Sequence, residues 1–124
     1  MLQRNKLVIF AEIIETSIMS ENVVLDKIGL TAKAVLPKDA KVILFGSRAR
    51  GDARADSDWD LLIILNKVNR DVDDINNYAC PFMELGYEIN QEINPIVYTT
   101  HEWAQRKSTV FRHFIEQEGI ELCH

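Results

Sequence analysis

Two aspartates separated by a single residue, Asp58 and Asp60, stand at the start of an apolar run in the stretch "FGSRARGDARADSDWDLLI", residues 45–63. Residues two apart in a strand project to the same face, so the two carboxylates should lie side by side, with Cα atoms roughly 6 to 7 Å apart. Two anions held this close favour a cation, and hard oxygen ligands suit Mg²⁺ or Mn²⁺. The pair therefore predicts a divalent metal site.

A phosphate-binding loop is expected directly ahead of the aspartates. Gly46 lets the backbone approach an anion closely, and Ser47 offers a hydroxyl. A helical turn over residues 47–50 would direct its first N–H groups at the same anion. A triphosphate bound there would bridge the loop and the metal, an arrangement that performs in-line transfer at phosphorus.

Three arginines in this stretch are the nearest approach to a basic cluster: Arg48, Arg50 and Arg54. Two interpretations stay open, contact with the bound nucleotide or pairing with neighbouring aspartates on the surface. The net charge of −5 gives no overall attraction for nucleic acid, so a polyanionic ligand needs this local cluster or bound cations. We expect no direct binding of nucleic acid.

Composition predicts one domain, residues 1–124, with a 47% apolar content that suffices for a core. The two cysteines, Cys80 and Cys123, are expected to be free thiols. The apolar run at 7–11 is followed at once by Glu12, so it is too short and too charged for a membrane span. We therefore expect a cytoplasmic protein without a membrane partner.

Periodicity predicts a mixed α/β fold, with a small mixed sheet flanked by helices. The expected helices cover 7–18, 22–36, 72–85 with an interruption near Pro81, and 99–119; the expected strands cover 41–45, 60–65 and 91–100. Pro95 argues for an edge position or a bulge in the last strand. Thr100 is the expected cap of the closing helix and Gly119 its end, with a buried stripe of Trp103, Phe111, Phe114 and Ile115.

"GSRARGDARADSDWDLLI" resembles the signature of the DNA polymerase β-like nucleotidyltransferase superfamily, because glycine–serine, arginine–glycine and serine–aspartate–x–aspartate–leucine fall in one register. The signature region is 41–65, and the resemblance covers roughly residues 22–122. The short length and the closing "FRHFIEQEGIEL" resemble the minimal nucleotidyltransferases, or MNT proteins, which are often the antitoxins of HEPN/MNT toxin–antitoxin pairs.

This resemblance implies a polymerase β-like nucleotidyltransferase fold, in which Gly46 and Ser47 bind phosphate and Asp58 and Asp60 bind the metal. Some MNT proteins transfer AMP from ATP to a tyrosine of the partner toxin. The implied function is thus metal-dependent nucleotidyl transfer to a hydroxyl of a HEPN-type toxin, with ATP as the expected substrate although no residue marks adenine over other bases. The residues expected to bind the nucleotide are Gly46, Ser47, Arg48 and Arg50.

The third carboxylate of the active enzymes in this superfamily has no evident counterpart. It comes from a later strand, completes the metal site and helps to deprotonate the attacking hydroxyl. In "QEINPIVYT" the comparable place holds Asn94, and Glu92 lies two residues earlier on the same expected face. Glu92 is the predicted stand-in and the third expected catalytic residue beside Asp58 and Asp60.

Two other functions stay open. A chain in which no third acid reaches the metal would be a non-catalytic antitoxin that acts by binding its toxin. A small-molecule nucleotidyltransferase, acting for example on an aminoglycoside antibiotic, would need a partner subunit, because this short chain leaves no room for a substrate-binding domain.

Overall fold

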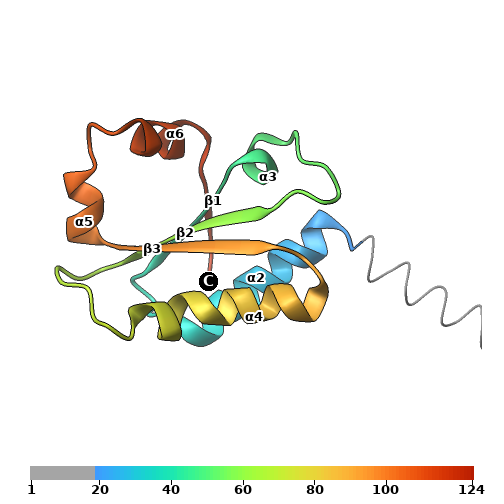
Figure 1. Ribbon diagram of the computed structural model, residues 1–124, viewed down its shortest axis with the longest axis horizontal. Helices are drawn as coiled ribbons and strands as arrows, with labels where there is room; N and C mark the ends of the chain where they lie inside the picture. Colours follow the sequence, from blue (N-terminus) through green and yellow to red (C-terminus); the bar gives the residue numbers. More distant parts are fainter. Residues whose placement is uncertain (1–18) are drawn as a thin grey trace, which may run out of the picture.

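Residues 19–124 are described by the computed structural model, and the sheet that they form has the strand order β3-β2-β1-β4 (Figure 1). β2 pairs antiparallel with β1, with Asp60 opposite Phe45, and parallel with β3, with Asp60 opposite Asn94. The strands are β1 (Lys41–Phe45), β2 (Trp59–Leu65), β3 (Ile93–Thr99) and β4 (Ile120–Leu122). The predicted helix over 7–18 lies outside the described residues.

Helices cover both faces of the sheet (Figure 1). On one face lie α2 (Glu21–Val35) and α4 (Cys80–Ile89), and on the other lie α5 (Thr100–Gln105) and α6 (Val110–Glu118). Residues of β2 alternate between the two layers: Leu61 and Ile63 pack in the core with α2 and α4, whereas Leu62 and Ile64 pack with Ile115 of α6. The mixed α/β prediction is confirmed, and so is the edge position of β3, where Pro95 costs no ladder hydrogen bond.

The helix expected over 72–85 begins later and ends later. A π-helical turn, η1 (Ile75–Ala79), comes first, and α4 follows it as far as Ile89. Pro81 lies in the first turn of α4, directly after η1, where its missing N–H removes one helical donor at the junction of the two segments. Asn90, in the left-handed conformation with φ 55°, ends α4.

The single closing helix expected over 99–119 is two helices, α5 and α6. Thr99, rather than Thr100, caps α5, because it forms a capping box with Glu102. A second cap, Thr109, starts α6, and Gly119 ends that helix as predicted. The expected buried stripe is wrong at Phe114, whose surface is 52% exposed. β4 is a further element that the sequence pattern did not predict, since its three residues pair with β1 only after the chain has turned back.

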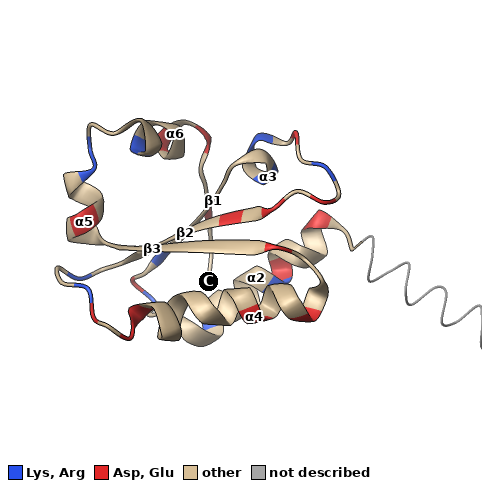
Figure 2. Cartoon of the chain, in the orientation of Figure 1, with Lys and Arg blue, Asp and Glu red and all other residues tan. Residues whose placement is uncertain are grey.

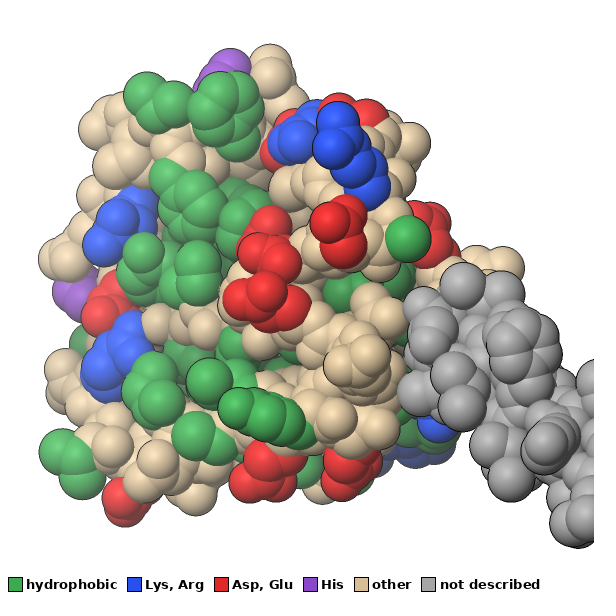
Figure 3. Space-filling view, turned by 45° about the vertical axis from the view of Figure 1, so that its right-hand side comes forward, with side chains coloured by type: hydrophobic (Ala, Val, Ile, Leu, Met, Phe, Trp, Pro, Cys, Tyr) green, Lys and Arg blue, Asp and Glu red, His purple; other side chains and the backbone are tan. Residues whose placement is uncertain are grey.

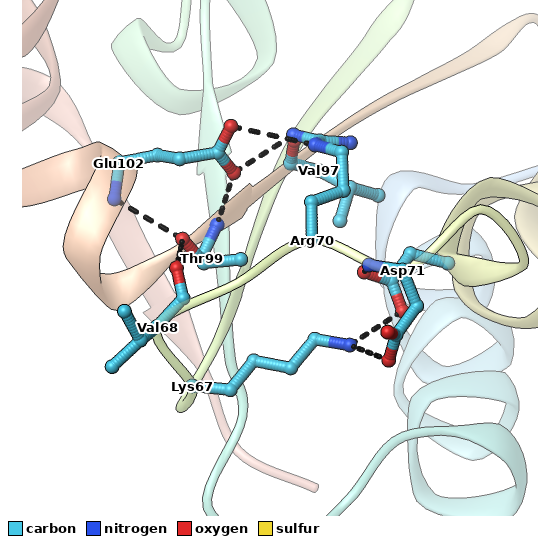
Figure 4. A network of polar contacts seen from close by, with 8 residues as sticks. Lys67, Val68, Arg70, Asp71, Val97, Thr99 and Glu102 are labelled. Carbon is cyan, nitrogen blue, oxygen red and sulfur yellow. Dashed lines mark hydrogen bonds and ion pairs between the residues drawn. The ribbon is translucent and has the colours of Figure 1, made fainter.

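Polar contacts hold the loop after β2 against β3 and α5 (Figure 4). Lys67 Nζ lies 2.7 Å from Oδ1 of the buried Asp74. Arg70 pairs with Glu102 and donates to the carbonyl of Val97. These contacts hold the end of β2 that lies away from Asp60. The polar site at the start of β2 is therefore on a strand that is fixed at its other end.

Both cysteines are free, as predicted. Among residues 19–124, no helix combines the length and the apolar character that crossing a membrane requires.

Candidate functional site

Asp58 and Asp60 lie where the polar loop 51–58 enters β2, and their carboxylates converge. Trp59 between them points into the core on the α2 and α4 side, where it is 1% exposed and donates from Nε1 to Gln91 Oε1 at 3.1 Å. Asn94 Nδ2 lies 3.2 Å from Asp58 Oδ2 and 3.5 Å from Asp60 Oδ1. Because one amide nitrogen reaches both carboxylates, the predicted side-by-side placement is confirmed.

The environment of Asp60 disfavours its charge. Burial is the main cause that raises the pKa of its carboxyl, and the negative charge of Asp58 raises it further. The hydrogen bond from Asn94 and the charge of Arg50 oppose the rise in pKa. A cation between Asp58 and Asp60 would relieve this cost, which is the electrostatic condition of a metal site.

Gly46 brings the start of α3 (Ser47–Arg50) against Asp60. Its φ is 76°, and a Cβ on Gly46 would lie 2.5 Å from Asp60 Oδ2. Only glycine fits both the conformation and the approach. The expected helical turn at Ser47 is confirmed, and the leading N–H groups of a helical turn have no partner within the turn. Gly46 and Ser47 therefore border the carboxylate pair from the β1 side.

Asn94, and not Glu92, lies across from Asp60 in the parallel register. Glu92 is exposed and precedes β3, and its backbone oxygen accepts the N–H of Trp59 at 2.8 Å. Its carboxyl still lies beside that of Asp58: a hydrogen bond with Asp58 is the first cause that raises the pKa of Glu92, followed by the charge of Asp58. The described residues hold no cluster of three or more acidic, histidine or cysteine side chains placed for a metal ion.

Arg48, an expected nucleotide ligand, is held by contacts within the protein. Its side chain is 5% exposed, and its guanidinium carbon lies 4.5 Å from the centre of the Trp59 ring. The guanidinium donates to Glu21 Oε1 at 2.9 Å and to the carbonyls of Ala55 and Ser57 at 3.2 and 3.0 Å. Through these contacts, Arg48 ties the loop that contains Asp58 to the start of α2.

Arg50 borders the site and is exposed. Its Nε pairs with Asp52 at 3.3 Å, and one of its terminal nitrogens pairs with Glu118 at the same distance. The hydrogen bond to Asp52 is the main cause that raises the pKa of Arg50. Exposed ion pairs of this kind contribute little to stability, so Arg50 can leave Asp52 or Glu118 and pair with an anionic ligand instead. The surface pairing of Arg50 therefore does not exclude contact with a nucleotide.

Charge of both signs gathers at this end of the sheet. Figure 2 shows acidic residues at the right-hand ends of β2 and β3, with basic residues on and after α3. In the space-filling view, a central acidic group lies between basic side chains and an apolar surface (Figure 3). Near the start of β2, the half-buried rings of Phe45 and Phe111 form an aromatic pair, and their centres are 5.5 Å apart.

A groove of about 550 Å³ adjoins the carboxylates on the β3 side. It is lined by residues 55–57, residues 90–94 and the side of α4 that carries Met83, Gly86 and Tyr87. The groove could not be predicted from the sequence, because its walls come from three separate segments that only the fold brings together.

The profile of the family described as nucleotidyltransferase domain matches residues 28–119. The chain belongs to this family. The superfamily resemblance carried by the loop and the aspartates is thereby confirmed.

A curated relative, the protein adenylyltransferase MntA of Aphanizomenon flos-aquae, is 28% identical in an alignment of 103 residues that covers 79% of this chain and 65% of the relative. The chain thus spans about two thirds of the length of that relative.

Two solved structures share the fold. One is a toxin–antitoxin with AMP-PNP, with TM-score 0.57 and 18% identity over 79% of this chain and 71% of that chain. The other is the tri-AMPylated HEPN toxin of Shewanella oneidensis in complex with its MNT antitoxin, with TM-score 0.55 and 16% identity over 83% of this chain and 71% of that chain. At these identities the likeness establishes the nucleotidyltransferase fold.

Proposed function

We propose that the protein is a metal-dependent nucleotidyltransferase that moves AMP from ATP to a hydroxyl of a partner protein. The observation that carries the proposal is the convergence of Asp58 and Asp60 next to the glycine-initiated turn at Gly46. A carboxylate pair beside a phosphate-binding turn is suited to the transfer of a phosphoryl-linked group.

Asp58 and Asp60 would hold Mg²⁺ or Mn²⁺, with Asn94 supporting both carboxylates. The donor set fits a hard cation, since Mg²⁺ is commonly bound by one or two carboxylates together with substrate phosphates. The raised pKa of Asp60 supports the same assignment, because a bound cation would compensate the cost of its buried charge. When bound, the metal supplies neutralisation of the charge on the phosphates.

Gly46 and Ser47 would bind the β- and γ-phosphates, with Arg50 at the rim. In the reaction, the oxygen of the acceptor hydroxyl forms a bond to the α-phosphorus, and the bond from that phosphorus to the bridging oxygen breaks. Pyrophosphate leaves with the electron pair of the broken bond. Glu92 would accept the proton of the hydroxyl, since its carboxyl is exposed and lies beside that of Asp58.

The similarity to a protein adenylyltransferase and to antitoxins solved with HEPN toxins supports ATP as the nucleotide and a HEPN-type toxin as the partner. Incubation of the protein with Mg²⁺, ATP labelled at the α-phosphate and the product of the neighbouring gene tests this function. The wild type should transfer the label to that protein. The variant in which Asp58 and Asp60 are both changed to Asn should transfer no label.

A non-catalytic antitoxin is the second candidate, and Asn94 is the observation that favours it. An amide in place of a third carboxylate lowers the negative charge that holds a metal. If the doubly substituted protein still suppresses its toxin and the wild type transfers no label, binding alone is the function.

A further inference from the structure

We infer that Glu118, the last residue of α6, competes with bound phosphates for Arg50 and thereby promotes the release of pyrophosphate. This inference rests on the proposed function, in which a triphosphate binds at Gly46 and Ser47 and pyrophosphate leaves. It adds a residue from the last helix that sets how tightly the site holds a polyphosphate.

The pairing of β4 with β1 brings Glu118 to the phosphate-binding turn. After α6 the chain returns to the sheet beside β1 (Figure 1), and Ile120 lies opposite Leu44 in the antiparallel register. Gly46 comes two residues after Leu44, and Glu118 comes two residues before Ile120. Because antiparallel partners run in opposite directions, this register carries Glu118 towards Gly46. Gly119 keeps the approach close, since a Cβ there would lie 2.7 Å from a side chain of β1.

Arg50 meets this carboxylate from α3. One of its terminal nitrogens lies 3.3 Å from Glu118 Oε1, and its Nε lies 3.3 Å from Asp52 Oδ2. Asp52 has the larger influence on the pKa of Arg50, but it belongs to the same loop and its side chain is 64% exposed. The Glu118 side chain is 23% exposed and is placed by α6 and β4. Of the two carboxylates, Glu118 is therefore the one that is fixed independently of the loop.

The position of Glu118 at the end of α6 favours its pairing with a cation. The unpaired carbonyl groups at the end of a helix carry a partial negative charge, so an acidic side chain is unfavourable there. The last turn of α6 contains no basic residue. Arg50 supplies the compensating charge from α3, and this pairing is the state of the site without phosphate.

Arg50 is also within reach of phosphates bound at the turn after β1. Burial raises the pKa of Asp60, and the charge of Arg50 opposes this rise, so the guanidinium acts on the carboxylate pair. Arg48, the other basic residue of α3, is engaged by contacts within the protein. A polyphosphate at the turn and Glu118 therefore compete for the guanidinium of Arg50.

This competition affects the product as well as the substrate. A ligand binds more weakly when its site is occupied by an internal partner for part of the time. Because partly exposed ion pairs are weak, the expected reduction in affinity is about 3-fold. Pyrophosphate would keep the contacts that the triphosphate made at the turn, so the return of Arg50 to Glu118 speeds its dissociation. Product release of this kind limits turnover in many enzymes.

A double-mutant cycle tests the inference by calorimetric titration of the full chain. The ligands are Mg²⁺ with pyrophosphate, and Mg²⁺ with a non-hydrolysable ATP analogue. Glu118→Gln removes the charge at nearly constant size and should tighten the binding of both ligands about 3-fold. Arg50→Gln should weaken both about 5-fold. In the Arg50→Gln background, Glu118→Gln should change neither affinity, because the cation for which it competes is absent.

Glu116→Gln is the matched control, because Glu116 is exposed on the same helix, pairs with Arg112 and carries the same charge. It should leave both affinities unchanged. A purely structural role of Glu118 predicts weaker binding in Glu118→Gln, so the expected gain separates the two roles.

Two results would overturn the inference and leave the proposed transfer intact. In the first, the analogue binds the wild type but Glu118→Gln does not tighten it. In the second, the full gain persists in the Arg50→Gln background, which would indicate general repulsion by Glu118 instead of competition for Arg50. If neither ligand binds the wild type, the proposed function is wrong as well.

Discussion

Asn94 on β3 stands across from Asp60 on β2, and its side-chain nitrogen joins Asp60 to Asp58 by contacts of 3.5 and 3.2 Å. The amide donates to two carboxylates that would otherwise repel each other. It occupies the place where the resemblance to active nucleotidyltransferases led us to expect a third acid. The activity of the protein therefore depends on what this one position contributes.

Asn94→Asp should increase metal-dependent transfer, because a third carboxylate in the same register strengthens the hold on a divalent cation. The same change should lower stability in the absence of metal, since it replaces a donor by a third negative charge. Mn²⁺ titration followed by electron paramagnetic resonance, together with transfer rates, measures both effects. Weaker Mn²⁺ binding in the variant would contradict this role of position 94.

Glu92→Gln should lower the transfer rate by about 10²-fold, the range expected for a lost general base. The base must be deprotonated, so the wild-type rate should rise with pH as the carboxyl of Glu92 loses its proton. The variant should lack this rise. If the variant keeps the wild-type pH profile, a group other than Glu92 accepts the proton.

Gly46→Ala should disrupt the site, because the added Cβ would meet Asp60 Oδ2 at 2.5 Å. Gly51→Ala is the matched control: Gly51 also has a positive φ, of 84°, but nothing lies within 4 Å of a Cβ there. Gly51→Ala should cost roughly 1 kcal/mol of stability through backbone strain in the left-handed region. Gly46→Ala should cost more, because its backbone, with ψ −157°, lies in a region that is essentially restricted to glycine. In calorimetric titration, only Gly46→Ala should lose ATP affinity, and equal affinities in the two variants would place the phosphates away from Gly46.

Arg48→Met should destabilise the protein by about 2 kcal/mol, since it removes charge-assisted hydrogen bonds from a buried guanidinium. It should also weaken metal binding, because the loop that leads into Asp58 loses its anchor. Glu21→Gln is a mild comparison, as its carboxylate is exposed and surface pairs contribute ~0–1 kcal/mol. Urea unfolding and Mn²⁺ titration report the two effects. Arg48→Lys with wild-type stability would contradict the anchoring role.

Asp60→Asn should stabilise the metal-free protein at neutral pH. Since burial raises the pKa of Asp60, the folded state binds its proton more tightly than the unfolded state does, and stability falls as pH rises through that pKa. The variant has no ionisable carboxyl at this position, so its stability does not fall in this way. Thermal unfolding in chelator should show a higher melting temperature than wild type at pH 7 and a much smaller difference at pH 3. An equal gain at both pH values would point to a cause other than charge.

Local spacing sufficed to predict the carboxylate pair, the turn after Gly46 and the edge strand with Pro95, because each depends on neighbours within a few residues. The choice between Asn94 and Glu92 depends on the register of two parallel strands joined through η1 and α4, which no local pattern records. The anchoring contacts of Arg48 could not be predicted for a related reason, since its partner Glu21 lies on a helix 27 residues earlier in the chain. The division of the closing helix depended on Thr109, whose capping hydroxyl was overlooked.

The central claim, that Asp58 and Asp60 serve adenylyl transfer to a protein hydroxyl, is tested most directly by intact-mass spectrometry. The product of the neighbouring gene would be incubated with ATP, Mg²⁺ and either wild type or the variant with both aspartates changed to Asn. We predict a mass increase of one or more AMP groups, located on tyrosine, with the wild type alone. An unmodified protein after incubation with wild type, or equal modification by the variant, would contradict the claim.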